Sequence, residues 1–253
     1  MKFIGIIPAR YASTRFPGKP LADIDGTPMV VRVVRQALKA LPRVIVATDD
    51  ERILTAVTSA GHEAVMTSTS HRSGTDRCFE AYTRSGSDAD VIINIQGDEP
   101  FVTPAQIDAL KACFEREDVD IATLARRFPQ NGSYEALEDP NTPKLVISEA
   151  GNALYFSRSV IPYLRGVEKA EWPSRHQYLT HVGMYAYRRE ALGRIVTLPQ
   201  SPLEVAESLE QLRWLQNGMT IAVGMTDDET VGIDTPEDLR RAVAFLRERG
   251  GEI

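Results

Sequence analysis

The stretch that decides the fold is residues 29–66, which read MVVRVVRQALKALPRVIVATDDERILTAVTSAGHEAVM. Apolar residues recur at helical spacing in the opening MVVRVVRQALKAL, and the β-branched run RVIVAT then predicts a strand. A second helix is predicted from the carboxylates Asp49 and Asp50 to Gly61, because acidic residues favour a helix start and glycine a helix end. The short strand EAVM follows. This alternation of helix and strand is typical of an α/β protein.

The same rhythm continues on either side of this stretch. KFIGII, at residues 2–7, predicts an earlier strand, and a loop rich in proline and glycine follows it. Downstream, TDRCFEAYTRSG predicts a helix, and VIINI, at residues 91–95, is a continuous apolar run of the kind found in buried parallel strands. We therefore expect an α/β fold with a doubly wound, mostly parallel sheet.

Three later helices are predicted to begin with one shared device. Residues 103–106 read TPAQ, with a capping threonine, proline at the first helical position and glutamine three residues after the cap. Residues 201–204 (SPLE) have the same form, and residues 235–238 (TPED) come close to it. The cap oxygen accepts a hydrogen bond from an unpaired N–H group, and proline has no N–H to satisfy.

The pattern becomes less regular after about residue 130. Residues 129–143 are rich in turn formers, and KLVIS and NALYFS predict short strands around Gly151. Residues 162–178 are polar and aromatic without a clear period, and HVGMYAY then predicts another strand. We expect a single domain, residues 1–253, with a small mixed lobe at about residues 130–195.

Composition disfavours several classes of protein. The 253 residues are 43% hydrophobic and 25% charged, as in ordinary globular proteins, and the net charge of −6 disfavours a nucleic-acid binder. Two cysteines, Cys78 and Cys113, cannot form a disulfide framework or a cysteine-rich zinc site, and we expect both to be small buried residues. The apolar run Phe3 to Ile7 is too short for a signal peptide, and no stretch matches a membrane span. We expect a cytoplasmic protein with neither nucleic acid nor membrane as partner.

The first candidate site is the loop between Ala9 and Pro20. It places Arg10, Arg15 and Lys19 close together in sequence, with hydroxyl side chains between them. Ligands bind at the carboxyl ends of strands in open α/β sheets, and cations, hydroxyls and backbone N–H groups suit a polyphosphate. The spacing matches neither a Walker A loop nor G-x-G-x-x-G. The residues alone leave a phosphate loop and a solvated charged turn equally open.

Two carboxylate segments form the second and third candidate sites. Asp98 stands in QGDEP, directly after the VIINI strand, and Asp234 stands in GIDTP, before a capped helix. Because Mg²⁺ commonly takes one or two carboxylates and leaves its other positions to water and phosphate, a shared Mg²⁺ is one interpretation. Adjacent strands of one sheet would then bring the two side chains to the same rim. The alternative is that Asp98 caps a turn before Pro100 and Asp234 only begins a helix.

A fourth candidate is the turn SGTDR at residues 73–77. Its small hydroxyl residues allow a ligand to come close, and Arg77 adds a cation. An ordinary helix start with Thr75 as the cap is an equally good interpretation.

The fifth candidate is spread along the second half of the chain. Arg158 and His181 could bind a carboxylate, and Glu210 and Gln211, expected on the helix capped by Ser201, could bind sugar hydroxyls. The residue types alone would not single these positions out, since a lone histidine is more often structural.

Segments along nearly the whole chain together resemble one family. IIPARYASTRFPGKPL, VATDD, MTS, HRSGTDR, NIQGDEP, ALYFSRSVIP, HVGMYAYR, SPLE with LEQLR, and GIDTPEDL occur in this order, from about residue 3 to residue 240. They resemble the CMP-KDO synthetases, which are 3-deoxy-manno-octulosonate cytidylyltransferases. Nucleotide-sugar pyrophosphorylases and CMP-sialate synthetases share the first loop only in a weaker form. The resemblance implies a fold of the nucleotide-diphospho-sugar transferase type and a homodimer, with the lobe at about 130–195 serving sugar binding and dimerisation.

The resemblance also implies a reaction. CTP and 3-deoxy-D-manno-octulosonate (KDO) would give CMP-KDO and diphosphate, for bacterial lipopolysaccharide biosynthesis, with Mg²⁺ as cofactor. The anomeric hydroxyl of the sugar acid would attack the α-phosphorus of CTP. Such a transfer needs positioning and charge neutralisation more than covalent groups, and a metal can both lower the pKa of the nucleophile and clamp the phosphate.

Residue roles follow from the same resemblance. Asp98 and Asp234 would hold the catalytic Mg²⁺, Lys19 and Arg15 would act on the phosphates, and a second Mg²⁺ would be carried by the triphosphate. The nucleotide-binding residues would be Arg10, Ser13, Arg15, Lys19, Thr67, Ser68, Ser73, Thr75, Arg77 and Gln96. The sugar acid would be bound by Arg158, His181, Tyr185, Glu210 and Gln211.

Two other classes of protein remain as alternatives. A metal-dependent glycosyltransferase would have a D-x-D motif after a strand, but residues 88–90 (DAD) and 118–120 (DVD) precede their predicted strands. A non-catalytic nucleotide-binding regulator would not need to keep together the four residues Asp98, Asp234, Arg15 and Lys19. Release of diphosphate from CTP in the presence of KDO separates the three classes.

Overall fold

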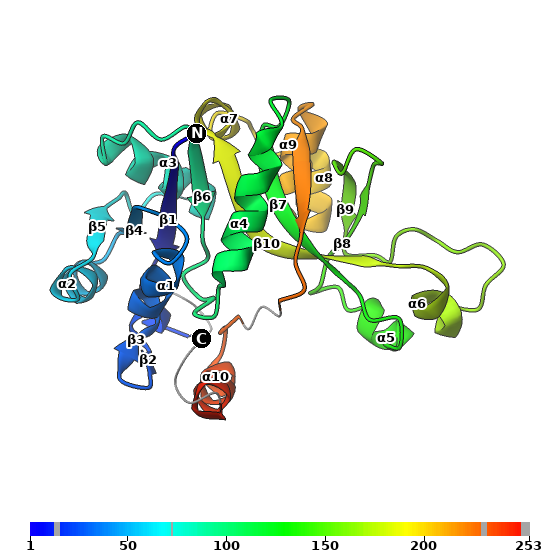
Figure 1. The fold of residues 1–253 in the computed structure, drawn as a ribbon, viewed down its shortest axis with the longest axis horizontal. Helices are drawn as coiled ribbons and strands as arrows, with labels where there is room; N and C mark the ends of the chain where they lie inside the picture. Colours follow the sequence, from blue (N-terminus) through cyan, green and yellow to red (C-terminus); the bar gives the residue numbers. More distant parts are fainter. Residues whose placement is uncertain (13–15, 72, 229–231, 249–253) are drawn as a thin grey trace. The chain divides into compact units, whose positions relative to one another are not determined.

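The chain forms two compact units in this computed structural model, which describes residues 1–12, 16–71, 73–228 and 232–248. The first unit comprises Met1–Asp108 with Glu229–Ile253, and the second comprises Ala109–Asp228. Figure 1 labels their helices and strands in chain order. The expected organisation, a single domain with a lobe at about 130–195, stays a prediction.

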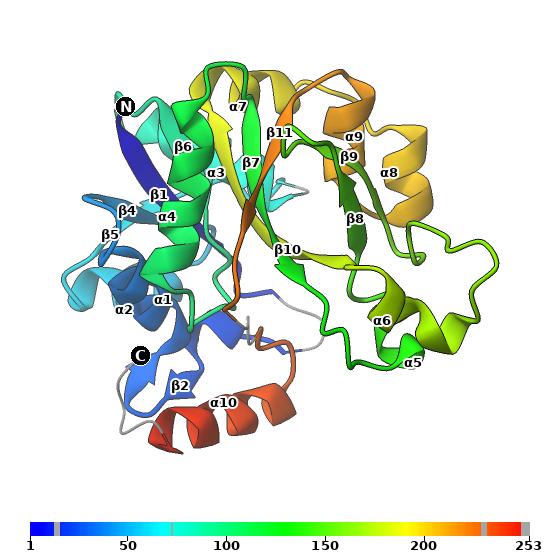
Figure 2. The ribbon, with the colours of Figure 1, turned by 45° about the vertical axis from the view of Figure 1, so that its right-hand side comes forward.

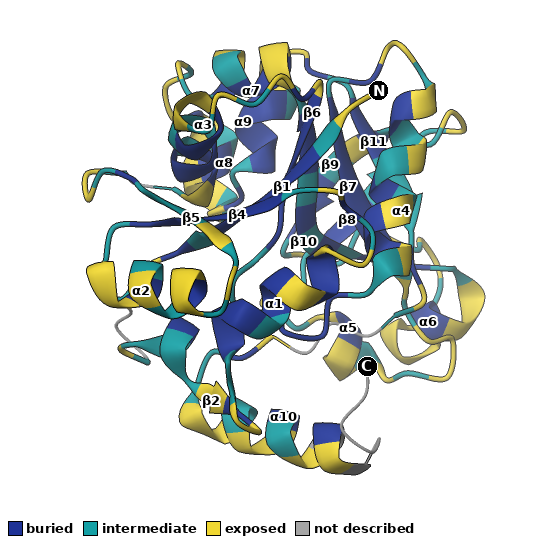
Figure 3. Cartoon of the chain, turned by 60° about the vertical axis from the view of Figure 1, so that its left-hand side comes forward, coloured by how far each residue is buried: buried dark blue, intermediate teal, exposed yellow. Residues whose placement is uncertain are grey.

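A parallel sheet with the strand order β6-β1-β4-β5 forms the centre of the first unit. Its strands are β1 (Phe3–Ala9), β4 (Val44–Thr48), β5 (Glu63–Met66) and β6 (Val91–Asn94). Every residue of β4 and β6 is buried, as the continuous apolar runs in the sequence predicted. Figure 3 shows these strands in dark blue and the outer turns of a neighbouring helix, α2 (Glu51–Ser59), in yellow.

The helices of this unit follow the predicted alternation. They are α1 (Met29–Ala37), α2, α3 (Gly74–Arg84), α10 (Pro236–Glu248) and α4 (Pro104–Ala112), which runs across the boundary between the units. A 3-10 turn (Lys19–Leu21) and a small hairpin of β2 (Asp23–Ile24) and β3 (Thr27–Pro28) precede α1. Cys78 is buried in α3 as expected, Cys113 is only half-buried, and both are free thiols.

An apolar cluster packs α10 and the residue Ile233 before it against the N-terminal part of this unit. Ile24, Met29, Phe101, Ile233, Ala242 and Leu246 are buried against one another. Figure 2 shows the result, with α10 lying beside β2. Because Ile233 belongs to this cluster, its neighbour Asp234 is brought back to the first unit from the far end of the sequence.

The second unit is built on mixed strand pairing. Strand β7 (Ile121–Arg127) pairs antiparallel with β10 (Leu179–Arg188) and parallel with β11 (Ile221–Met225). Strand β8 (Lys144–Ile147) pairs antiparallel with β10 and with β9 (Ala153–Ser157). Short helices complete the unit: α5 (Tyr134–Leu137), α6 (Trp172–Arg175), α7 (Arg189–Ile195), α8 (Pro202–Glu207) and α9 (Gln211–Gln216).

The aperiodic residues 162–178 contribute to a small aromatic core of their own. Leu137, Trp172 and Tyr178 are buried together, and the ring of Tyr134 meets that of Trp172 edge-on at 5.5 Å. The segment has no regular hydrophobic period because its apolar residues lie in a loop and in one helical turn. They do not form one face of a long helix or strand.

The three predicted helix starts are confirmed. At α4 the N–H of Gln106 donates to Thr103 Oγ1 at 3.2 Å, and Gln106 Oε1 accepts from the N–H of Thr103 at 3.0 Å. Ser201 and Glu204 form the same reciprocal pair at α8. At α10 the threonine before the proline is paired in the same way with the carboxylate three residues on. No helix in the described part of the chain is long and apolar enough to cross a bilayer.

Candidate active site

A cavity of about 530 Å³ opens in the first unit, beyond the carboxyl ends of β1 and β6. Parallel α/β sheets bind ligands at this edge. Seven residues that the sequence put forward line it: Arg10, Lys19, Ser73, Arg77, Gln96, Asp98 and Asp234. Three of the seven are cations and two are carboxylates, so the cavity is suited to a ligand with several phosphates and a metal ion.

Lys19 bridges the two carboxylates that the sequence singled out. Its Nζ atom lies 2.6 Å from Oδ2 of Asp98 and 3.1 Å from Oδ1 of Asp234. Burial by itself would lower the pKa of Lys19, but the two carboxylates outweigh it and the pKa is raised. The ammonium group is therefore charged at neutral pH, and it stands where a cation bound by both carboxylates would stand. This donor set fits Mg²⁺, which often takes one or two carboxylates and completes its shell with water and phosphate.

The two carboxylates meet by a route that the sequence did not predict. The expectation that adjacent strands bring them together is wrong, because β6 pairs with β1 and β11 pairs with β7. Instead, the N–H of Ile233 donates to the carbonyl oxygen of Asp98 at 3.0 Å, and the side chain of Ile233 is buried in the apolar cluster next to α10. A loop contact and a hydrophobic anchor thus place Asp234, with the capped start of α10 just behind it.

The turn that carries Lys19 is held by its neighbours. Gly18 has a φ of 73°, in the left-handed region that favours glycine, and its N–H donates to the carbonyl oxygen of Tyr11 at 2.9 Å. A Cβ atom at Gly18 would lie 3.1 Å from the Tyr11 ring, and the guanidinium of Arg52 stacks on that ring at 3.3 Å. The sequence did not single out Tyr11 or Arg52. The predicted nucleotide-binding residues Ser13 and Arg15 lie outside the described residues.

Gly97 allows the loop after β6 to come close to strand β1 in this cavity. A Cβ atom there would lie 2.9 Å from the carbonyl oxygen of Pro8, which is too close for any other residue without a backbone shift. The next residue but one, Glu99, has its pKa raised to about 7 by burial and by the negative charge of Asp98.

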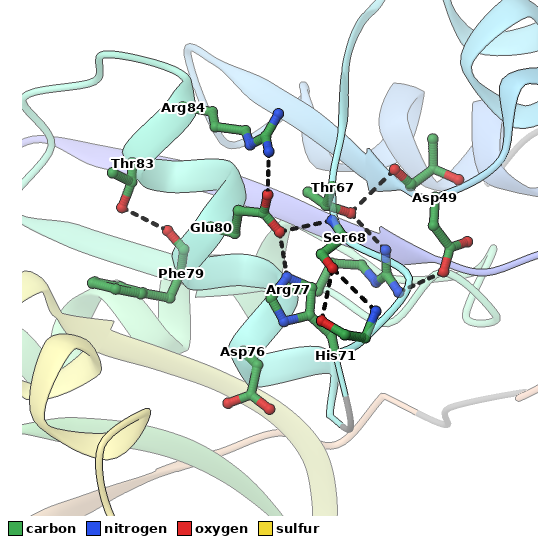
Figure 4. A network of polar contacts seen from close by, with 12 residues as sticks. Asp49, Thr67, Ser68, His71, Asp76, Arg77, Phe79, Glu80, Thr83 and Arg84 are labelled. Atoms are coloured by element: carbon green, nitrogen blue, oxygen red, sulfur yellow. Dashed lines mark hydrogen bonds and ion pairs between the residues drawn. The ribbon is translucent and has the colours of Figure 1, made fainter.

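Arg77 is a buried anchor in the wall of the cavity. Its side chain is 1% exposed, and its guanidinium donates to Thr67 Oγ1 at 2.5 Å and to Asp49 Oδ2 at 2.7 Å (Figure 4). The hydroxyl of Thr67 in turn donates to the carbonyl oxygen of Thr48 at 3.1 Å. Thr67 therefore joins β4 to β5 and α3 and is not among the residues that line the cavity, so the nucleotide contact expected of it stays a prediction.

Glu80 on α3 holds the loop that follows β5 (Figure 4). Its carboxylate accepts the N–H of Ser68 at 2.8 Å, is in contact with Nε2 of His71, and pairs with Arg84 at 2.6 Å. Burial would raise the pKa of Glu80, but these partners outweigh it and lower that pKa. Ser68 thus shapes the loop and is not among the residues that line the cavity, so its expected nucleotide contact also stays a prediction. The sequence did not reveal Glu80, because a glutamate in mid-helix looks like any solvated residue.

Ser73, and not Thr75, begins α3. Its Oγ atom accepts the N–H of Asp76 at 3.1 Å, so the alternative interpretation with Thr75 as the cap is wrong. Thr75 is buried in the first turn and is not among the residues lining the cavity, whereas Ser73 and Gln96 do line it.

His181 and Tyr185, two of the predicted sugar-acid residues, lie on β10 in the second unit. His181 Nε2 is 2.9 Å from Thr123 Oγ1, and burial lowers the pKa of His181 to about 4. Tyr185 packs against His181 and Trp214, and burial raises its pKa well above 10. Both side chains are therefore neutral at physiological pH and can offer hydrogen bonds but no charge.

Glu210 and Gln211 lie on a different helix from the expected one. Helix α8, which Ser201 caps, ends at Glu207, and Ser208 has a φ of 51°. Glu210 precedes the first residue of α9 and pairs with Arg213 at 2.7 Å. The side chain of Gln211 is buried, and its Nε2 has no hydrogen-bond partner among the described residues.

Arg158 makes contacts that the prediction of carboxylate binding did not anticipate. Its guanidinium donates to the carbonyl oxygens of Glu207 and Pro140, each at 2.6 Å. It therefore closes the C-terminal end of α8. It also lines a second cavity, of about 420 Å³, with the rings of Tyr134 and Trp172.

The two D-x-D sequences are structural in this fold. Asp90 accepts the backbone N–H of Lys2 at 2.7 Å, and Asp88 pairs with the side chain of the same lysine. Asp118 pairs with Arg116 at 2.7 Å, and Asp120 accepts the N–H of Thr220 at 2.9 Å. None of the four carboxylates lines the cavity of the first unit.

Comparisons with known proteins agree with the geometry. The family model described as cytidylyltransferase matches residues 4–221. The 3-deoxy-manno-octulosonate cytidylyltransferase of Phocaeicola vulgatus is 59% identical over 252 residues, covering 100% of both chains. That of Parabacteroides distasonis is 58% identical, covering 98% of this chain and 100% of the relative.

A solved structure gives the same result at the level of the fold. CMP:2-keto-3-deoxy-manno-octonic acid synthetase complexed with CTP is 41% identical, has a TM-score of 0.90, and is matched over 98% of this chain and 100% of its own. The likeness confirms the predicted α/β class with a mostly parallel central sheet. The chain belongs to the cytidylyltransferase family.

Proposed function

We propose that this protein is a 3-deoxy-manno-octulosonate cytidylyltransferase, which transfers CMP from CTP to KDO, releases diphosphate and serves lipopolysaccharide biosynthesis. The observation that carries the proposal is the cavity of the first unit, where Lys19 joins Asp98 and Asp234 beside Arg10. The relatives that bear this name are matched over the whole chain, which supports the choice of nucleotide and sugar acid.

The residues of the cavity divide the work by charge. Arg10 and Lys19 bind the phosphates of the nucleotide, because charge-assisted hydrogen bonds are the strongest that a phosphate can receive. Asp98 and Asp234 would hold Mg²⁺. When bound, this ion would lower the pKa of the attacking hydroxyl and neutralise negative charge on the α-phosphate.

In the second unit, three of the proposed sugar-acid residues, His181, Tyr185 and Gln211, act as neutral hydrogen-bonding groups. His181 and Tyr185 are uncharged at physiological pH, and the Nε2 group of Gln211 is a buried donor with no partner among the described residues. A buried donor left unpaired is costly, so a sugar hydroxyl that accepts its hydrogen bond would be favoured.

Diphosphate release is the test of this proposal. The protein is incubated with CTP, KDO and Mg²⁺, with CTP alone and CTP with N-acetylneuraminate as controls. Diphosphate and CMP-KDO should form only when KDO is present. A metal-dependent glycosyltransferase would release no diphosphate from CTP, and a nucleotide-binding regulator would bind CTP without turnover, so either result would contradict the proposal.

We also propose that the protein is a homodimer, on the basis of its resemblance to the family. Light scattering at micromolar concentration should give twice the chain mass of 28.0 kDa. A mass near 28.0 kDa under these conditions would refute the dimer and leave the proposed reaction unaffected.

A further inference from the structure

The ammonium group of Lys19 lies between two carboxylates that come from distant parts of the sequence. Its Nζ atom is 2.6 Å from Asp98 and 3.1 Å from Asp234. The lysine side chain is 14% exposed, whereas the carboxylate side chains are 32% and 46% exposed and line the cavity. The largely buried ammonium group thus pairs with two carboxylates, and both carboxylates remain accessible to a ligand.

The lysine keeps the carboxylates together. Two like charges only a few ångströms apart repel each other, and a cation between them removes that repulsion. The loops cannot relieve the repulsion by moving apart, because the backbone hydrogen bond from Ile233 to Asp98 and the buried side chain of Ile233 hold them. Lys19 therefore holds Asp98 and Asp234 in place while no other cation is bound.

The ammonium group of Lys19 cannot contact both carboxylates and a phosphate group closely at the same time. Its backbone is fixed by a tight turn, in which the N–H of Leu21 donates to Gly18 at 2.8 Å and the N–H of Ala22 donates to Lys19 at 3.0 Å. Its side chain is a flexible four-carbon stem with a point charge at the tip. A triphosphate in the same cavity carries more negative charge than the carboxylate pair, so it draws the ammonium group toward itself.

We propose that Lys19 and a divalent cation exchange places on Asp98 and Asp234 when a nucleoside triphosphate binds. The identity of the nucleotide rests on the proposed function. Before the nucleotide arrives, the ammonium group keeps divalent cations off the carboxylates. Once the triphosphate has drawn the ammonium away, the cation takes the carboxylates. Cation and nucleotide binding are then coupled, and by linkage each strengthens the other.

The exchange is tested by titrating the nucleotide-free protein with Mn²⁺ and following free Mn²⁺ by electron paramagnetic resonance. Lys19→Met should bind Mn²⁺ at least about tenfold more tightly than wild type, because a positive charge next to the cation has been removed. Lys19→Arg, which keeps the charge, should resemble wild type. The matched control is Lys39→Met, a substitution of an exposed lysine after α1, and it should leave the affinity unchanged.

Further variants show where the gain arises. Adding Asp98→Asn to Lys19→Met should abolish the gain, and Lys19→Gln is a second neutral variant in case Lys19→Met does not fold. Unchanged Mn²⁺ affinity in a folded neutral variant would overturn the exchange, and so would a gain that survives Asp98→Asn.

A measurement on the wild-type chain does not depend on any variant. The reactivity of Lys19 toward acetic anhydride, read by mass spectrometry, should be the same with and without Mn²⁺, and should change when CTP and Mn²⁺ are added together. A rise with Mn²⁺ alone would mean that the metal displaces the lysine unaided, which contradicts the exchange.

The failure of the proposed function gives a different pattern of results. Turnover of CTP and KDO by the wild type is measured in parallel. Wild-type turnover without any gain of Mn²⁺ affinity in the neutral variants leaves the function in place and removes the exchange. A gain in those variants without wild-type turnover removes the assigned substrates and supports the exchange at the same pair of carboxylates.

Discussion

At the scale of single residues, Asp98 and Asp234 hold Lys19 in this structure, and in the proposed function they would hold a metal ion instead. Lys19 contacts one oxygen of each carboxylate. A pair that acts on one cation works as a unit, so the loss of either member removes most of what the pair does. His181 is a second single residue with an unusual property, because burial lowers its pKa from the usual 6.5 to about 4.

Asp98→Asn and Asp234→Asn should each lower kcat by about 100-fold, the scale of losing one electrostatic stabiliser of the reacting charge. The double variant should be little worse than either single variant, whereas the binding of CTP should be weakened less, because Arg10 and Lys19 still face the phosphates. Steady-state kinetics with titrated Mg²⁺ measure all three variants. The control is Asp88→Asn, whose carboxylate pairs with Lys2 at the surface. A folded Asp234→Asn enzyme with normal kcat would reduce Asp234 to a helix-start carboxylate.

His181 should make the protein less stable in mild acid. Its pKa is about 4 in the folded chain, below the usual value of 6.5, so between these pH values the unfolded chain binds a proton that the folded chain does not. The free energy of unfolding should therefore decrease as pH falls from about 6.5 toward 4, by about 1–3 kcal/mol from this residue.

His181→Gln should flatten this dependence, with His176→Gln as the control substitution. Urea unfolding at pH 7 and at pH 4.5 measures both variants. If wild type and His181→Gln lost the same stability over this range, the depressed pKa of His181 would be refuted.

At the scale of elements, buried ion pairs decide how the loops around the cavity are held. Arg77 joins α3 to the residue after β4 and to the end of β5, and Glu80 joins α3 to the loop that follows. Both residues stand on the face of α3 that packs toward these strands and loops (Figure 4). Helix α3 thus supports the cavity wall through side chains that do not resemble a binding motif.

Arg77→Met should destabilise the protein by roughly 3–5 kcal/mol, because it leaves the carboxylate of Asp49 largely buried without a partner. Arg84→Met is the matched control on the same helix. Arg84 pairs with Glu80 but is 56% exposed, so its removal should cost only about 0–1 kcal/mol. Chemical unfolding compares the two variants. Equal stability would show that the pair of Arg77 and Asp49 contributes no more than a surface contact.

At the scale of the whole molecule, the proposed nucleotide site is built by distant parts of the chain. The cavity of the first unit needs the loop before Lys19, the residues after β6 and the segment that precedes α10. A ligand bound to these parts stabilises them together, since it binds the folded chain and not the unfolded one.

CTP with Mg²⁺ at about 100 times its Kd should add about 2.7 kcal/mol to the free energy of unfolding. For a chain of this length, that corresponds to a rise in Tm of roughly 5–11 °C. Scanning calorimetry measures the shift, with GTP and Mg²⁺ at the same concentrations as the control nucleotide. An equal shift with both nucleotides would contradict a site that selects cytidine.

The sequence by itself determined the elements of the fold and most of the residues of the cavity. Strands β1, β4 and β6 and the capped starts of α4, α8 and α10 were predicted, because apolar periodicity and cap chemistry are local properties of the chain. The resemblance to one family added the roles of Asp98, Asp234 and Lys19, which the structure brings into contact.

Only the tertiary structure decided which polar residues line the cavity and which support the fold. Thr67 and Ser68 bond to backbone and to α3, Arg158 closes α8, and the break at Ser208 has neither glycine nor proline to mark it. The meeting of Asp98 and Asp234 depends on a backbone hydrogen bond and on the burial of Ile233. The reason is physical: the burial of a charge and its partner depend on segments far apart in sequence, whereas a cap or a period is complete within a few residues.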